Sequence, residues 1–524
     1  MTGARCPERP GWPPILWLLL TLALILRINF SAGLSGNDDL AIGFNAIRLL
    51  DQGLWLPQGH YEARYGLIIP LAAIFYMFGV GVIQLIAMPM AVSLFGIFLA
   101  WRIGAGLFGR AAGLWAAAAL AVYPMDVEFA GVFFPDATQG TLMAAAFWLS
   151  VAGQHGRQRM LTALAAGFLW AWAYYVKVDS FVMAAVFTLA WLLGYLTFAR
   201  MLFVGLVALS LVGVELAVYA RLAGDPLHHI ALDRIATNEA LAAGQDYRNF
   251  MTYPKAMFLT VYQTGLQYYL GLGAVLLALI RRERAALLVV GWVMIFHAWL
   301  AFGIDPLASP VRLKPQLTRY LMVYAIPLSV LVGWFIAWSY DKISRALTVL
   351  AALSAAALAL LCMTFNTLNY QAARASTLAV QEAVRNNWFP LYTEVQSIQV
   401  ARFLLHGSPH AAQVMPAQEH DFLRGETRFR DVSEPRAWLL INEEYSRRLE
   451  RRNLVKPIAP ERFGMLVVPV LSIDRPLPGI SYVALDVLAR AADLLPIASL
   501  RTKIRDTAQE AMAPGVAKVY ELSR

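Results

Sequence analysis

The sequence predicts a polytopic α-helical membrane protein followed by a soluble α/β domain, and three observations support this. Of the 524 residues, 59% are hydrophobic and only 15% are charged, which is too much apolar surface for a water-soluble globule. Nearly charge-free windows long enough to cross a bilayer recur as far as residue 366. Beyond residue 369 polar and apolar residues are mixed. We therefore expect a transmembrane domain over residues 1–369 and a separate domain over residues 370–524.

The candidate membrane spans follow one another closely. A transmembrane helix needs about 20 predominantly apolar residues, and long windows of this kind cover residues 12–30, 82–101, 135–153, 201–220, 257–280, 286–303, 319–339 and 346–366. Shorter candidates cover residues 111–125, 160–176 and 180–197. We interpret Leu67 to Phe78 as a shallow or re-entrant segment, which gives about eleven crossings. The stretch Leu67 to Trp101 contains no charge, so two tight spans there, and a total of about 11 to 13, stay open. We interpret the first window as an uncleaved anchor rather than a signal peptide, because many spans follow it.

Basic residues indicate how the spans are oriented. With the N-terminus in the cytoplasm, arginine and lysine gather at the predicted cytoplasmic ends, namely at Arg5, Arg9, Arg102, Arg110, Arg157, Arg159, Arg200, Arg281, Arg282, Arg284, Lys342 and Arg345. This pattern explains the formal net charge of +9 better than nucleic-acid binding does, so we expect membrane lipids and no nucleic acid as partners. The acidic loops and the C-terminal domain then face the opposite side. The only cysteines, Cys6 and Cys362, provide neither a plausible disulfide nor a cysteine-based zinc site.

The loop after the first span, residues 31–66, places charged side chains at a membrane face. Asp38 and Asp39 follow the span directly, and Glu62 and Arg64 stand just before the next apolar stretch. Between these clusters, apolar residues at helical spacing predict a short amphipathic helix in the interface plane. The two acids could simply cap that helix, because aspartate is favoured at a helix N-terminus. Capping occupies only part of a carboxylate, so a catalytic role stays open.

Further polar residues fall on the same predicted side of the membrane. The second loop contains Asp126, Glu128 and Asp136, and Asp136 could merely open the next helix, where acids are favoured. Together with Asp38 or Asp39, the three acids could also hold a hard cation. Lys177 and Asp179 interrupt an apolar stretch, where they could form a local ion pair or contact a phosphate.

Arg319 and Tyr320 open a later span, shortly after Arg312 and Lys314. Tyrosine and arginine anchor many membrane helices at the interface, which is one interpretation of this pattern. The other interpretation is that the three basic groups bind a phosphate-bearing lipid headgroup.

Residues 370–524 have the pattern of a soluble α/β domain. Helical periodicity covers residues 371–386 and 443–454, and short β-rich runs cover residues 437–441, 466–471, 482–487 and 516–520. The length, about 155 residues, is normal for one domain.

Several loose motifs, correctly ordered along the chain, resemble the GT-C superfamily of polyprenyl-phosphate-sugar-dependent glycosyltransferases. They are Asn37-Asp38-Asp39, the segment Glu62-Ala63-Arg64-Tyr65-Gly66, the string from Ile103 to Ala117, Tyr123-Pro124, Pro135-Asp136 and Thr318-Arg319-Tyr320-Leu321. The likeness covers roughly residues 12–366 and is strongest to the bacterial branch similar to protein O-mannosyltransferases and lipid A aminoarabinose transferases. The acidic pair of the family is usually Asp-Glu, where this chain has Asp38-Asp39. Arg64 stands where the aminoarabinose branch tends to have a lysine.

The resemblance implies a GT-C fold and a transferase that moves a hexosyl or pentosyl unit from a polyprenyl-phosphate donor to a glycan, lipid or protein acceptor. It also implies a site on the periplasmic face of a bacterial inner membrane. Asp38 matches the leading aspartate of the family and is the expected base, with Asp39 orienting it or binding substrate. The candidate ligands of the donor phosphate are Arg64, Lys177, Arg319 and Tyr320, and the candidate ligands of the sugar or acceptor are Glu62, Glu128 and Asp136.

The chemistry of such a donor sets the roles of these groups. A phosphate leaving group is a weak base at neutral pH, so it needs charge neutralisation more than a protonating acid. An acceptor hydroxyl is a weak nucleophile and needs a carboxylate that takes its proton. One base and no second acid predict a single displacement with inversion. The scheme requires no cofactor, and a divalent metal stays open.

Two other functions stay open from the sequence. A multi-pass transporter or lipid flippase would line a path with intramembrane charges, whereas the candidate site residues here gather at one membrane face and only Glu215 and His297 interrupt spans appreciably. A polymerase or ligase of cell-envelope glycans would also use a long outer loop.

Overall fold

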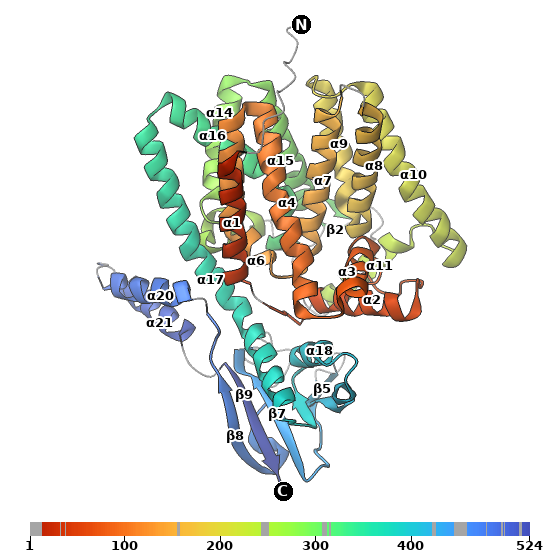
Figure 1. Cartoon of the computed structure of the whole chain (residues 1–524), viewed down its shortest axis with the longest axis vertical. Coiled ribbons are helices and arrows are strands. Elements are labelled where there is room, and N and C mark those ends of the chain that lie inside the picture. Colours follow the sequence, from red (N-terminus) through yellow and green to blue (C-terminus); the bar gives the residue numbers. More distant parts are fainter. Residues whose placement is uncertain are drawn as a thin grey trace.

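The computed structural model describes residues 13–524 except 32, 37, 155–157, 243–250, 306–311, 314–315, 422–425, 445–457, 478, 494–495, 497 and 513–515. It shows a bundle of apolar helices with a small β-sheet domain at one end (Figure 1). The long helix α17 (Arg345–Arg385) runs out of the bundle and into this domain. The predicted fold class, an α-helical membrane protein with a C-terminal α/β domain, is confirmed.

The bundle is built from the segments that the sequence predicts as spans. Its helices are α1 (Pro14–Asn29), α4 (Val82–Phe108), α5 (Arg110–Ala121), α7 (Pro135–Ala152), α8 (Arg159–Val176), α9 (Met183–Leu192), α10 (Phe198–Leu222), α14 (Gln267–Arg281), α15 (Arg284–Phe302), α16 (Ala325–Lys342) and the first part of α17. In the described chain, five helical stretches are long and apolar enough to cross a membrane, namely Val82–Phe108, Phe198–Leu222, Arg284–Phe302, Thr318–Lys342 and Arg345–Asn366. The other helices of the bundle are shorter or less apolar.

One predicted span is wrong in its extent. The window 257–280 contains a π-helical turn at Lys255–Leu259, then α13 (Val261–Thr264), and only then α14. Gly265 has a φ of +60° at the end of α13, a conformation that glycine adopts without strain. This glycine ends the helical run, so a regular helix starts only at Gln267.

The end of the bundle next to the sheet domain, here called the site end, carries the loops that the sequence singles out. Figure 1 shows α2 (Asp38–Gln52), α3 (Tyr65–Phe78) and α11 (His228–Ala242) there. The predicted amphipathic helix of the first loop is α2, which buries Leu40 and Ile47 in a core shared with α3. With 14 residues, α3 rises only about 21 Å, less than the apolar thickness of a bilayer.

The C-terminal domain centres on a five-stranded mixed sheet of order β4-β3-β7-β9-β8. Its strands are β3 (Leu391–Thr393), β4 (Val414–Pro416), β7 (Arg436–Asn442), β8 (Leu466–Ile473) and β9 (Ala517–Ser523). The pairs β3–β4 and β3–β7 are parallel, and β9 is antiparallel to β7 and β8. The end of α17 and the helix α18 (Val395–Leu404) share an apolar core with this sheet. Two short hairpins, β1–β2 (Ile304–Asp305 and Arg312–Leu313) and β5–β6 (Gln418–Asp421 and Glu426–Phe429), lie outside it.

One of the predicted strands is wrong, and one predicted helix is longer than expected. Residues 482–487 belong to α20 (Gly479–Ala492), which packs against α21 (Ala498–Ala511). The buried residues of α20 are Ser481, Leu485 and Ala492, at the spacing of one helix face, whereas its β-branched residues are exposed. The helix expected over 371–386 is the continuation of the last span in α17. The helix expected over 443–454 falls mostly outside the described residues.

Candidate active site

The two adjacent acids at the start of α2 have different environments. Both oxygens of Asp39 bind Ser35, one accepting from the backbone N–H and the other from the hydroxyl, each at 2.6 Å. Asp39 therefore holds the turn that leads into α2, as a capping residue does. Its neighbour Asp38 instead meets groups from distant parts of the chain. Asn37 lies outside the described residues.

Asp38 is buried between a phenol and a guanidinium. The hydroxyl of Tyr61 donates to its Oδ1 at 2.5 Å, and Nη1 of Arg319 lies 2.7 Å from its Oδ2. Burial alone would raise the pKa of Asp38, but Arg319, Tyr61 and the nearby Arg64 together lower it below its ordinary value. Asp38 is therefore ionised at neutral pH, which a general base requires.

A second buried carboxylate continues this cluster. Asp136, in the first turn of α7, lies 2.8 Å from Nζ of Lys177 and 3.7 Å from Nε of Arg319. Lys177 also stands 3.8 Å from Asp179 and 3.5 Å above the centre of the Tyr320 ring. Burial lowers the pKa of Lys177, but the charges around it, Asp136 first, outweigh this and raise it. Charges of both signs thus alternate from Asp38 to Lys177.

Two glycines allow the segments that carry these residues to approach closely. Gly66 follows Arg64 at the start of α3, where a Cβ would lie 2.6 Å from the backbone nitrogen of Val176. Gly140 lies one turn after Asp136, where a Cβ would lie 2.6 Å from the carbonyl oxygen of Val323 in the 3-10 helix η3 (Thr318–Tyr324). A side chain at either position would push apart the backbones that hold the site.

Arg64 is a buried cation that no carboxylate among the described residues neutralises directly. Its guanidinium lies 5.1 Å from the ring centre of Tyr61, and the residue is 7% exposed. Within the part of the chain that the structure describes, its Nη1 is buried without a hydrogen-bond partner and its side chain forms no ion pair. Since a buried charge is stable only when it is paired, this geometry favours an anionic ligand at Arg64.

Sequence reasoning missed two residues that help to build this cluster. They are Tyr61, whose hydroxyl binds Asp38, and Phe134, whose ring lies 4.6 Å from the guanidinium of Arg319. His60, which the sequence places with Glu62 and Arg64 before the second apolar stretch, lies against Tyr61 with ring centres 3.8 Å apart. Burial, and next the charge of Arg64, lower the pKa of His60 to about 4, so His60 is neutral at physiological pH. For Tyr61 the available signal was position alone, because it stands next to the charged residues of the first loop.

Glu62, a predicted substrate ligand, is used to fold the loop. Its carboxylate accepts hydrogen bonds from Nε1 of Trp55 at 2.8 Å and from the backbone of Gln58 at 3.1 Å, and lies 3.3 Å from Arg48. These contacts close the segment between α2 and α3, and they do not include Asp38.

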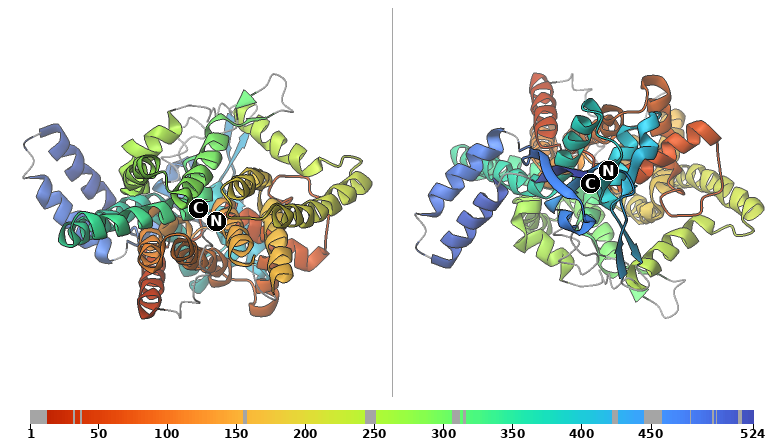
Figure 2. Two further views of the ribbon diagram at one scale, coloured as in Figure 1. Left: turned by 90° about the horizontal axis from the view of Figure 1, so that it is seen from above. Right: turned by 90° about the horizontal axis from the view of Figure 1, so that it is seen from below.

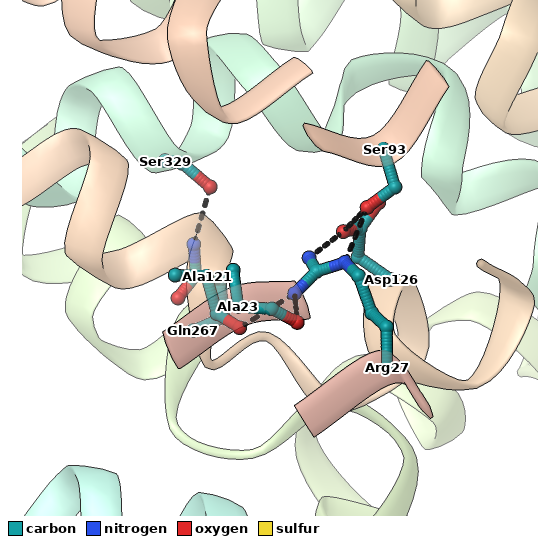
Figure 3. A network of polar contacts seen from close by, with 7 residues as sticks. All are labelled: Ala23, Arg27, Ser93, Ala121, Asp126, Gln267 and Ser329. Carbon is teal, nitrogen blue, oxygen red and sulfur yellow. Dashed lines mark hydrogen bonds and ion pairs between the residues drawn. The ribbon is translucent and has the colours of Figure 1, made fainter. Parts of the chain in front are cut away.

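Glu128 and Asp126 lie apart from the cluster. Burial raises the pKa of Glu128 well above its ordinary value, whereas neighbouring cations lower the pKa of Asp38, so the surroundings of the two carboxyls differ. Asp126 pairs with Arg27, which also donates to Ser93 at 2.6 Å (Figure 3). This network ties α1 to α4 and α6 (Pro124–Phe129).

The three acids of the second loop therefore do not form the shared cation site that the sequence left open. Asp126 is neutralised by an arginine and Asp136 by a lysine. Among the described residues, no group of three histidine, cysteine or acidic side chains has the geometry to hold a metal ion.

Comparison with known proteins places this geometry in a structural class. No protein-family model and no curated sequence matches the chain. ArnT from Cupriavidus metallidurans bound to undecaprenyl phosphate has 14% identity and a TM-score of 0.52, over 83% of this chain and 94% of that one. The oligosaccharyltransferase AglB from Archaeoglobus fulgidus, in complex with an inhibitory peptide and a dolichol-phosphate, has 10% identity and a TM-score of 0.51. That match covers 97% of this chain and 88% of the other.

The chain has the GT-C fold. At such low identities the likeness concerns the backbone, so the roles of individual side chains rest on the geometry described above. In this GT-C chain, the cluster is assembled from the first loop, the start of α7, the end of α8 and η3, which meet at the site end.

Proposed function

We propose that this GT-C protein is a membrane glycosyltransferase that moves a sugar from a polyprenyl-phosphate donor to an acceptor hydroxyl, with Asp38 as the general base. The observation that carries the proposal is the pairing of an ionised, buried Asp38 with Arg319, next to Arg64, a cation that pairs with no described carboxylate. The two structural neighbours support the donor class, because their structures contain undecaprenyl phosphate and dolichol-phosphate. The acceptor is a glycan, a lipid or a protein.

In the proposed reaction the acceptor oxygen attacks the anomeric carbon while the bond from that carbon to the phosphate oxygen breaks. Asp38 takes the hydroxyl proton, and the bonding electrons leave with the phosphate, so the configuration inverts. Arg64, Arg319 and Lys177 neutralise the departing charge, with the ring of Tyr320 placing the lysine. Asp136 holds Lys177 and Arg319 in position for this task.

Arg319 couples donor binding to the base. In the structure it occupies Oδ2 of Asp38, one of the two oxygens that could accept a proton. A bound phosphate would compete for the same guanidinium and release this oxygen toward the acceptor. The base would then become fully available only after the donor has bound.

An apolar groove offers a path for the lipid tail. It has a volume of about 520 Å³ and lies between η1 (Val178–Val182) with α9 and the end of α15, lined by residues such as Phe181, Ala298 and Trp299. The indole of Trp299 also donates to Oδ1 of Asp179 at 3.1 Å, and Asp179 neighbours Lys177. The groove thus begins beside the charged cluster. We therefore propose this groove as the route of the lipid tail.

The distribution of basic residues supports a cytoplasmic N-terminus, which would place the site end and the sheet domain in the periplasm of a bacterial inner membrane. The sheet domain lies close to the cluster, because α18 packs on α2 with Phe403 next to Gly43. We assign acceptor docking to this domain.

The proposed activity is tested with the purified chain in liposomes and a labelled polyprenyl-phosphate sugar. We expect free polyprenyl phosphate to be released in equal amounts with the glycosylated acceptor. A transporter or flippase would instead move the intact lipid across the bilayer without breaking the bond. Flux without cleavage would overturn the proposal.

Replacing Arg64 by alanine is expected to weaken binding of the donor phosphate. A hydrogen bond to a charged group is worth about 1.5–3 kcal/mol, which corresponds to a dissociation constant raised by roughly 10- to 150-fold. The thermal stability should not fall, because no described carboxylate pairs with this guanidinium. Titration with polyprenyl phosphate and a melting curve measure the two effects, and Arg48→Ala, in the same loop, is the matched control. Unchanged phosphate affinity would exclude Arg64 from the donor site.

Filling the apolar groove is expected to weaken binding of long-tailed donors more than binding of short-tailed ones. The substitution Ala298→Trp places an indole where the groove is lined by a small exposed residue. We expect KM to rise about tenfold for a long-tailed donor and little for a short-tailed analogue, because only the long tail loses buried apolar contact. Leu209→Trp, on the exposed face of α10, is the control. Equal effects on both donors would argue against the groove.

A further inference from the structure

The hairpin of α20 and α21 projects sideways from the rest of the molecule in all three views (Figures 1 and 2). It follows β8 in the chain and precedes β9, but it takes no part in the sheet. Of its two helices, α20 is the one nearer to the level of the bundle in Figure 1. The sheet does not require a helical hairpin between β8 and β9, so the hairpin needs a separate explanation.

Among the described residues, one face of α20 is apolar and exposed. Ile480, Val483 and Val487 are 50%, 64% and 58% exposed, and their spacing of three and four residues places them in one stripe. The opposite face is covered, because Ser481 and Leu485 are buried. The hairpin therefore satisfies its own packing with one face of α20 and leaves this stripe for another partner.

The hairpin is attached where α17 leaves the membrane-spanning layer. Leu477, Leu485 and Ala508 form a small core, and Phe365 of α17 packs against it. Phe365 is the last residue but one of the apolar stretch Arg345–Asn366. The hairpin is thus held at the depth where the apolar layer ends, and the exposed stripe of α20 lies at the level of that boundary.

The charged residues beside the stripe also suit a helix at the boundary of the apolar layer. Asp486 and Arg490 form an ion pair at 2.8 Å one turn apart on α20, and Arg505 of α21 pairs with Asp493. An interfacial helix places its apolar face below the headgroups and its charges among them. Paired charges carry little net charge, so apolar contact rather than attraction to anionic lipid would dominate.

We propose that α20 is an interfacial membrane helix whose stripe of Ile480, Val483 and Val487 inserts into the lipid leaflet at the site end. The occupant of this face is lipid because the hairpin packs on Phe365, at the end of the apolar stretch of α17, which holds the stripe at the depth where that stretch ends. The C-terminal domain is then held to the membrane at two points, α17 and α20, which fixes the position of the sheet relative to the cluster around Asp38. This inference does not depend on the reaction that the cluster catalyses.

The test uses the full-length chain with Cys6→Ser and Cys362→Ser, reconstituted in phosphatidylcholine liposomes. A single cysteine is introduced by Val487→Cys or, as a matched control on the exposed polar surface of α21, by Thr502→Cys, and it is labelled with an environment-sensitive fluorophore. We expect lipids brominated near the headgroup to quench the label at position 487 at least about threefold more than the label at 502. Aqueous iodide should show the opposite preference.

Two results would overturn the proposal. If iodide reaches position 487 as readily as 502, the stripe lies in water. If position 487 is protected from iodide but brominated lipid does not quench it, the stripe is covered by protein, such as a second copy of the chain. Both positions are exposed in the structure, so neither substitution should prevent folding.

Discussion

Replacement of Asp38 by asparagine is expected to lower the turnover of glycosyl transfer by about 10³-fold, within the range measured when a general base is removed. The amide keeps the size of the side chain and can still accept the hydrogen bond of Tyr61, but it cannot take a proton from the acceptor. Arg319 retains Asp136 as a counter-charge, so the protein should remain folded. Single-turnover transfer from a labelled donor in liposomes measures the effect, and a melting curve verifies folding.

Asp39→Asn is the matched control, since the two residues are neighbours with the same chemistry. Its expected effect is on stability, because Asp39 binds the backbone and hydroxyl of Ser35 and loss of such a cap costs about 0.5–2 kcal/mol. If Asp38→Asn turns over at a near-normal rate while Asp39→Asn does not, the base would have to be reassigned to Asp39.

The first loop shows how far sequence reasoning reaches. Charged residues between two apolar stretches predicted a site at a membrane face, and the structure brings Asp38 and Arg64 of this loop into one cluster. Because formal charge was the only criterion, Glu62 was selected with them, although it serves to fold the loop. Tyr61 was overlooked for the same reason, since a phenol carries no charge at neutral pH.

The partners from later segments illustrate a different limit. The sequence separates Asp38 from Arg319 by most of the bundle, and the contact depends on how η3 docks against α7. That docking is possible only because Gly140 has no side chain. No local sequence pattern predicts that residue 140 has to be glycine for this purpose. Hydropathy located the spans well because burial in lipid acts on each helix separately. Strand propensity failed at residues 482–487, where β-branched residues suggested a strand although they belong to the exposed stripe of a helix.

Replacement of Arg319 by glutamine is expected to have the broadest effect, because this residue contacts both buried carboxylates. Removal of one partner of a buried ion pair costs about 3–5 kcal/mol, and here two carboxylates would face each other without the intervening charge. Turnover should also fall by about 10²–10³-fold through loss of a cation at the leaving phosphate. Adding Asp136→Asn to Arg319→Gln removes one of the repelling charges. The double variant should therefore recover stability but not turnover, which separates the structural effect from the catalytic one.

Arg319→Gln is also expected to change the pH dependence of the reaction. In the wild type Arg319 is the main opponent of the burial that would raise the pKa of Asp38, and the net pKa is lowered. Asp38 therefore stays ionised as the pH falls through its ordinary value. In Arg319→Gln burial prevails, the pKa rises, and the acidic limb of kcat/KM should move to higher pH by about one unit or more. Arg319→Lys keeps the charge and should leave the limb near its wild-type position. If Arg319→Gln slows transfer without moving this limb, Arg319 would act on the donor alone, and the coupling between donor binding and the base would be wrong.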